Sequence, residues 1–82
     1  MKIEYYKSAI CPRCAVVTRT LAELEAKHPE LEIERMEIFT HPARTLKAGV
    51  RGIPALRVGD DLQSWFLPKR EEVLEFLQPH LP

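Results

Sequence analysis

The chain has 82 residues, of which 45% are hydrophobic and 29% are charged, and its formal net charge is zero. This length accommodates one domain, which we expect to span residues 1–82, and the composition excludes a disordered or fibrous chain. The basic residues are scattered among acidic ones, which argues against nucleic acid as a partner.

No segment reaches the roughly 20 apolar residues that a membrane-spanning helix needs, so we expect no membrane partner. The first seven residues carry one glutamate and two lysines, where an export signal would have an apolar core. We therefore expect a cytoplasmic protein, and we expect it to be a monomer.

The first half of the chain alternates between strand and helix patterns. Residues 3–6 are rich in β-formers and predict a first strand. From residue 12 to about 27, apolar side chains recur at helical spacing, and His28-Pro29 predicts the end of this helix. Residues 31–38 alternate between apolar and polar side chains with one change of phase, which predicts a second strand.

The second half is predicted to contain a short helix, a β-hairpin and a final helix. We expect a helix over 43–48, strands over 55–58 and near 62–66 with a turn at 59–61, and a helix from about 68 to 78. The resulting order, β-α-β-α-β-β-α, requires a parallel crossover at its start and an antiparallel hairpin near its end. The predicted fold class is therefore α/β, with a mixed four-stranded sheet and helices on both faces.

Cys11 and Cys14 are the two cysteines of the chain, and they stand where the first strand passes into the first helix. The partial positive charge at a helix N-terminus stabilises a thiolate there. The spacing also allows the second thiol to attack a mixed disulfide formed by the first. Arg13 adds a cation that favours the thiolate further. We therefore assign Cys11 as the attacking nucleophile and Cys14 as the resolving thiol.

Two structural interpretations of the cysteine pair are weaker. A zinc site needs two further ligands, but the chain has no other cysteine, and His28, His41 and His80 lack the spacing of a ligand pair. A disulfide that closes so short a loop removes little chain entropy and stabilises a fold only weakly. We expect no metal and no other cofactor.

A second motif, Gly52-Ile53-Pro54, stands at the start of the third predicted strand. Proline at this position marks either a strand beginning or a special peptide bond. Residues 31–59 resemble the middle of thioredoxins, in which an Asn-Pro turn, a helix and an Arg-Gly-Ile-Pro-Thr strand follow one another. The start, with Cys11-Pro12-Arg13-Cys14, is more similar to glutaredoxins, whose active site is Cys-Pro-x-Cys. The chain thus resembles the thioredoxin/glutaredoxin superfamily over nearly its whole length.

This resemblance implies the thioredoxin fold and thiol–disulfide oxidoreductase activity on protein or small-molecule disulfides. It matches Cys11 and Cys14 to the redox cysteines of the superfamily and Pro54 to the cis-proline beside the active site. Ile53 matches the residue whose backbone pairs with a bound substrate chain, a small case of strand addition. The implied partners are disulfide-containing protein substrates and a flavoprotein thioredoxin reductase or a similar reductant.

The chain also departs from both families. Ala9-Ile10 replaces the tryptophan before the thioredoxin motif, and the buried aspartate of the first thioredoxin strand falls on Tyr5, so no proton acceptor for Cys14 is evident. Pro12 and Arg13 replace the thioredoxin Gly-Pro, and we expect both to contact substrate. The Gly-Gly-x-Asp with which glutaredoxins contact glutathione is missing, which argues against glutathione as the reductant.

Several alternatives stay open at this point. One is a glutathione-dependent glutaredoxin, and another is a thioredoxin-fold module that binds a metal or an iron–sulfur centre between two copies through Cys11 and Cys14. Lys7 either adds positive potential near the thiolate or is simply solvated. Trp65 either lines a substrate groove or packs on the core. Arg13 predicts a redox potential less reducing than that of thioredoxin, and the glutamates around the second strand are assigned to its solvent face without a role.

Overall fold

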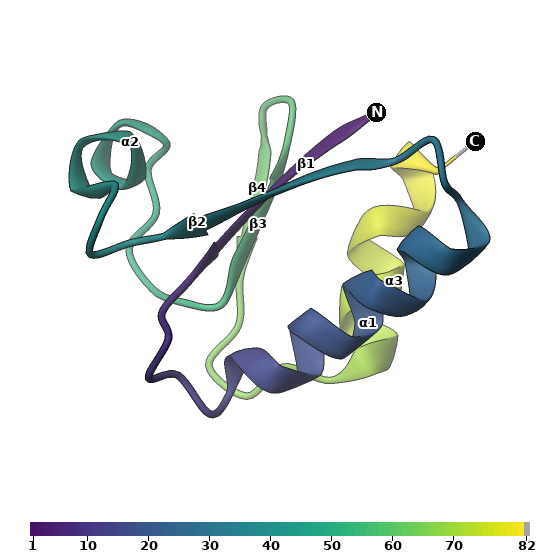
Figure 1. The fold of residues 1–82 in the computed structure, drawn as a ribbon, viewed down its shortest axis with the longest axis horizontal. Helices are drawn as coiled ribbons and strands as arrows, with labels where there is room; N and C mark the ends of the chain where they lie inside the picture. Colours follow the sequence, from purple (N-terminus) through teal and green to yellow (C-terminus); the bar gives the residue numbers. More distant parts are fainter. Residues whose placement is uncertain (82) are drawn as a thin grey trace.

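The computed structural model describes residues 1–81, in which strands and helices alternate (Figure 1). In chain order they are β1 (Lys2–Lys7), α1 (Cys14–Lys27), β2 (Glu32–Glu37), α2 (Pro42–Lys47), β3 (Ala55–Val58), β4 (Asp61–Ser64), α3 (Arg70–Leu77) and a 3₁₀-helix (Gln78–His80). This order confirms the predicted β-α-β-α-β-β-α arrangement, to which the structure adds the terminal 3₁₀-helix.

The predicted boundaries differ from the observed ones by two residues at three element ends and by one residue at several others. The first helix begins at Cys14 rather than at Pro12, because a turn precedes it in which the Cys14 N–H donates to the Cys11 carbonyl at 3.1 Å. The last helix begins at Arg70 instead of near residue 68, and the fourth strand ends at Ser64 instead of residue 66.

The four strands form one mixed sheet in the order β2-β1-β3-β4. β1 pairs parallel with β2 and antiparallel with β3, and β3 pairs antiparallel with β4. In the hairpin Val58 stands opposite Asp61, which leaves a two-residue turn that starts with Gly59. Gly59 has a φ of +61°, a conformation that glycine adopts readily and that suits the first position of such a turn.

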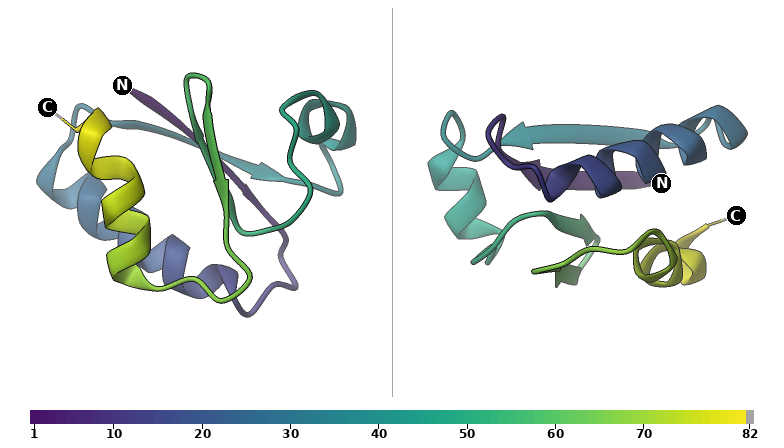
Figure 2. Two further views of the ribbon diagram at one scale, coloured as in Figure 1. Left: turned by 180° about the vertical axis from the view of Figure 1, so that it is seen from behind. Right: turned by 90° about the horizontal axis from the view of Figure 1, so that it is seen from below.

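The two faces of the sheet are covered by different helices, since successive side chains of a strand point to opposite sides. Ile3 and Tyr5 point to the face that α1 and α3 cover, where the larger core cluster lies. Tyr6 points to the other face and packs in a smaller cluster with Met36 and Val50. Figure 1 shows α1 and α3 on one side of the sheet and α2 on the other, and Figure 2 shows the same separation from behind. Helices therefore cover both faces, as predicted.

The helical spacing read from the sequence corresponds to the buried face of α1. The buried apolar side chains of this helix are Cys14, Val17, Leu21 and Leu24. Burial of each aliphatic side chain stabilises the fold by about 1.5–3 kcal/mol relative to its exposure. This face fixes α1 on the sheet and with it the first turn of the helix, which begins at Cys14, and the preceding turn, which contains Cys11. Within residues 1–81, no helix is long and apolar enough to cross a membrane.

Candidate active site

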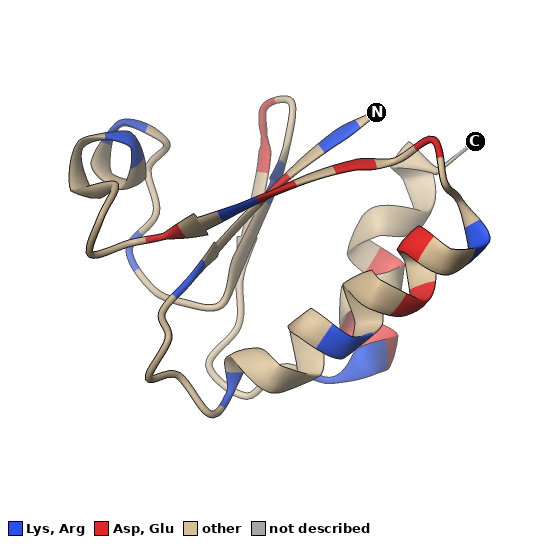
Figure 3. Ribbon diagram, viewed as in Figure 1, with Lys and Arg blue, Asp and Glu red and all other residues tan. Residues whose placement is uncertain are grey.

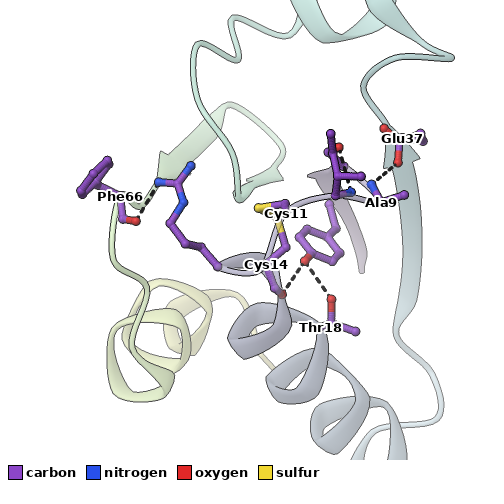
Figure 4. Close-up of a disulfide and its surroundings, with 10 residues drawn as sticks. Ala9, Cys11, Cys14, Thr18, Glu37 and Phe66 are labelled. Atoms are coloured by element: carbon purple, nitrogen blue, oxygen red, sulfur yellow. Dashed lines mark hydrogen bonds between the residues drawn. A yellow bond between two sulfur atoms is a disulfide. The ribbon is translucent and has the colours of Figure 1, made fainter.

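Cys11 and Cys14 form a disulfide at the end of β1, with their Cα atoms 5.4 Å apart (Figure 4). The side chain of Cys14 is 3% exposed and belongs to the main core, whereas Cys11 is partly exposed. Solvent therefore reaches the first sulfur more readily than the second. This asymmetry is what an attacking and a resolving thiol require.

The loop that leads into Cys11 is fixed by its own backbone N–H groups. The Ala9 N–H donates to Oε2 of Glu37 at 2.6 Å, and the Ile10 N–H donates to Oγ of Ser8 at 3.3 Å. The Cys11 N–H donates to the Ser8 carbonyl at 3.3 Å. The sequence had assigned no role to Glu37. The signal that points to it is the parallel pairing of the first two strands, which puts the carboxyl end of β2 beside this loop.

Tyr5 lies beneath the first turn of α1, at the position matched to the thioredoxin aspartate. Its side chain is fully buried, its hydroxyl donates to the Cys14 carbonyl at 2.9 Å, and the same hydroxyl lies 2.9 Å from Oγ1 of Thr18 (Figure 4). Burial raises the pKa of Tyr5 above its ordinary value of 10.0. The group beneath Cys14 is therefore a neutral hydrogen-bond donor and not a carboxylate. This contact was not foreseen from the sequence.

Arg13 makes its contacts with Phe66. Its Nη1 donates to the Phe66 carbonyl at 2.8 Å, and its guanidinium lies 4.9 Å from the centroid of the Phe66 ring. Phe66 is 78% exposed, so this cation–π pair lies at the surface. The sequence predicted that Arg13 favours the thiolate and contacts substrate. It had no signal for a partner 53 residues away.

The second sequence motif lies at the same end of the sheet as the cysteines. The peptide bond between Ile53 and Pro54 is cis, and Pro54 is fully buried. Because Tyr6 stands opposite Ala55, Pro54 meets the end of β1 from which the chain continues to Cys11. Ile53 and Cys11 are both partly buried against the main core cluster. The fold therefore brings together two motifs that are far apart in the sequence.

The other residues singled out from the sequence lie either near the disulfide or in the core. Pro12 is exposed beside the disulfide, and Lys7 is partly exposed at the end of β1. Trp65 is 8% exposed and packs edge to face on Phe76, with ring centroids 5.9 Å apart. It is therefore a core residue. Among residues 1–81, no three His, Cys, Asp or Glu side chains converge to hold a metal ion.

In sequence, the chain is similar to a thioredoxin and a probable thioredoxin. No family model matches the chain. A thioredoxin of Methanocaldococcus jannaschii is 24% identical over 99% of this chain and 96% of its own length. A probable thioredoxin of Methanothermobacter marburgensis is 22% identical over the same shares.

Solved structures show the same likeness in three dimensions. Oxidised mitochondrial thioredoxin 3 of Saccharomyces cerevisiae has a TM-score of 0.78 at 14% identity, and the match covers 95% of this chain and 76% of that one. Thioredoxin 1 of Thermosipho africanus has a TM-score of 0.76 at 19% identity, and the match covers 98% and 93% of the two chains. The fold of this chain is therefore the thioredoxin fold.

Proposed function

We propose that this chain, a thiol–disulfide oxidoreductase of the thioredoxin/glutaredoxin superfamily, reduces disulfides of protein substrates by cycling Cys11 and Cys14 between dithiol and disulfide. The observation that carries the proposal is the unequal exposure of the two sulfurs at the start of α1. The first turn of this helix holds no acidic residue. No carboxylate there opposes the partial positive charge that favours a Cys11 thiolate.

The proposed cycle has two exchange steps. The Cys11 thiolate attacks one sulfur of the substrate disulfide, forms a mixed disulfide and releases the other substrate sulfur as a thiolate. Cys14 then loses its proton to solvent and attacks the Cys11 sulfur, and the remaining substrate sulfur leaves as a thiolate. The substrate gains two electrons, and the protein is left with the Cys11–Cys14 disulfide. A reductant must then return two electrons to the pair.

Four residues around Cys11 are proposed to contact the substrate. The backbone of Ile53, beside Pro54, is suited to pair with an extended substrate chain because Ile53 lies outside β3 and, within residues 1–81, its N–H and carbonyl make no backbone hydrogen bond. Pro12 is exposed next to the nucleophile, and Arg13 with its Phe66 contact presents a cationic and aromatic surface.

The proposed electron donor is a flavoprotein thioredoxin reductase or an enzyme of similar type. A glutathione-dependent donor is less favoured, because the glutathione-binding Gly-Gly-x-Asp of glutaredoxins is missing from this chain. Here Gln63 and Ser64 belong to β4 and Trp65 is buried in the core. The proposal further assigns the chain a monomeric, single-domain state and a cytoplasmic location, where the thiol-reducing poise favours substrate reduction. Gel filtration of the reduced protein tests the monomer.

A redox titration tests the cycle. Free thiols are alkylated after equilibration in defined dithiothreitol buffers, and we expect a reversible two-electron transition between about −280 and −180 mV. Cys14→Ser should trap a mixed disulfide with a protein substrate, whereas Cys11→Ser should trap none. A transition below about −300 mV, or no transition, would indicate an inert structural disulfide. The metal or iron–sulfur alternative would then gain support, and visible absorption of freshly purified protein would test it.

A further inference from the structure

A hollow of about 320 Å³ lies beside the disulfide on the α1 side. Both cysteines line it, and so do Lys7 from the end of β1 and Thr18 and Arg19 from α1. Neither residue of the cis peptide lines it. The hollow is therefore separate from the segment to which the proposed function assigns backbone pairing with substrate.

The charge that lines this hollow is entirely positive. Lys7 and Arg19 are its ionisable side chains apart from the cysteines, and within residues 1–81 neither forms an ion pair. The glutamates of α1 lie farther along the helix, where Glu25 binds Arg35 and Glu23 binds Arg70. Figure 3 shows basic residues along the first part of α1 and acidic residues farther along it, before the lysine that ends the helix.

We infer that this hollow binds an acidic side chain of the protein substrate, an Asp or Glu close to the cysteine that Cys11 attacks. The inference rests on the proposed function, because it concerns the carboxylate of a substrate that exchanges with Cys11. Two cations without internal partners beside a reactive sulfur complement a carboxylate and raise the local concentration of an acidic substrate. The substrate would lie across the disulfide, with backbone contacts toward Ile53 and its carboxylate between Lys7 and Arg19.

This role differs in one measurable way from a general effect of the two cations on the thiolate. Stabilisation of the Cys11 thiolate changes the rate with every disulfide, whereas carboxylate binding changes the rate only with an acidic substrate. The informative quantity is therefore the ratio of two rate constants, for an acidic substrate and for its neutral analogue. A change in the reactivity of Cys11 itself cancels from this ratio.

The test uses two disulfide-linked peptides that differ only by Glu or Gln beside the cysteine, with neutral 4,4′-dithiodipyridine as a general probe of activity. At about 0.01 M ionic strength, where charges act over about 30 Å, we expect reduced wild-type protein to react about three- to tenfold faster with the Glu peptide. At about 1 M the screening length falls to about 3 Å, and the ratio should approach one.

The variants locate the effect. In Lys7→Gln/Arg19→Gln the ratio should fall to about one at low salt. Lys27→Gln/Lys47→Gln is the matched control, because it also removes two charges, one at the far end of α1, about 20 Å along the helix, and one at the end of α2 on the other side of the sheet. This control should keep most of the wild-type ratio. A loss of the ratio in the control as well would overturn the local site and attribute the preference to net charge.

Two further outcomes would overturn the inference in distinguishable ways. A ratio of one in the wild-type protein, with dithiodipyridine still reduced, removes the carboxylate site and leaves the proposed function intact. No reaction with any of the three disulfides removes the proposed function itself.

Oxidised glutathione serves as a separate substrate in the same assay. If it reacts faster than the Glu peptide and only its rate depends on Lys7 and Arg19, the carboxylate bound there is that of glutathione and not a protein side chain.

Discussion

The hydroxyl of Tyr5 offers the most direct test of how the first turn of α1 is held against the sheet. Tyr5→Phe removes one atom from a fully buried side chain and abolishes two contacts, the bond to the Cys14 carbonyl and the contact with Thr18, each at 2.9 Å. The phenyl ring that remains cannot donate to the Cys14 carbonyl. We therefore expect a loss of about 1–2 kcal/mol in the free energy of unfolding.

Urea denaturation of the oxidised protein measures this loss. The midpoint should fall while the slope m stays unchanged, because the surface exposed on unfolding is the same. For a domain of this size the melting temperature should fall by about 5–15 °C. A loss below about 0.3 kcal/mol would refute the view that this hydrogen bond holds the turn.

Thr18→Ala is the matched control for this experiment. Thr18 is exposed, and its removal leaves the bond from Tyr5 to Cys14 in place, so we expect a loss of less than about 0.5 kcal/mol. In Tyr5→Phe the freed Thr18 hydroxyl could turn to the Cys14 carbonyl, four residues before it in the helix, and partly compensate. The double variant removes this compensation, so comparing all four proteins isolates the contribution of the Tyr5 hydroxyl.

Three further predictions concern other parts of the molecule. Arg13→Gly should shift the redox potential to a more reducing value if the cation stabilises the dithiolate. Arg13→Lys should retain most of the wild-type potential, because it keeps the charge while weakening the planar contact with Phe66. An unchanged potential in the glycine variant would contradict this account. Burial raises the pKa of Tyr6 to about 12, above about 10 in the unfolded chain. This contribution to stability is present below pH 10 and is lost as the pH rises to about 12, so the wild type should lose roughly 2 kcal/mol relative to Tyr6→Phe over that window. Parallel pH profiles in urea denaturation would show that no such shift exists. Gly49→Ala should lower the free energy of unfolding by about 1 kcal/mol, because the φ of +83° is strained for alanine. The added Cβ causes no clash, since it would lie 3.7 Å from Leu62 in ordinary contact. A melting temperature equal to that of the wild type would refute the backbone argument.

The strands and helices could be predicted from the sequence because each leaves a pattern within a few residues. The strand over residues 55–58 was predicted with its observed bounds, and the buried face of α1 followed from the spacing of its apolar side chains. The start of α1 was misjudged by two residues. A proline at position 12 is compatible both with the first turn of a helix and with the turn that precedes one.

The cysteine pair and the proline at position 54 were also singled out from the sequence. Cys11 and Cys14 signal their chemistry by spacing and by their place between a strand and a helix. That Pro54 meets the same end of the sheet followed only from the resemblance to a known family. In the structure it follows from the antiparallel register of β1 and β3.

What the tertiary structure alone decided is which distant side chains surround the cysteines. Glu37 holds the loop before Cys11 from a neighbouring strand, Arg13 binds Phe66 from beyond the hairpin, and Lys7 and Arg19 line one hollow from two different elements. These contacts depend on strand register and on how α1 crosses the sheet. No local pattern in the sequence encodes either, because both arise from packing between residues that are far apart along the chain.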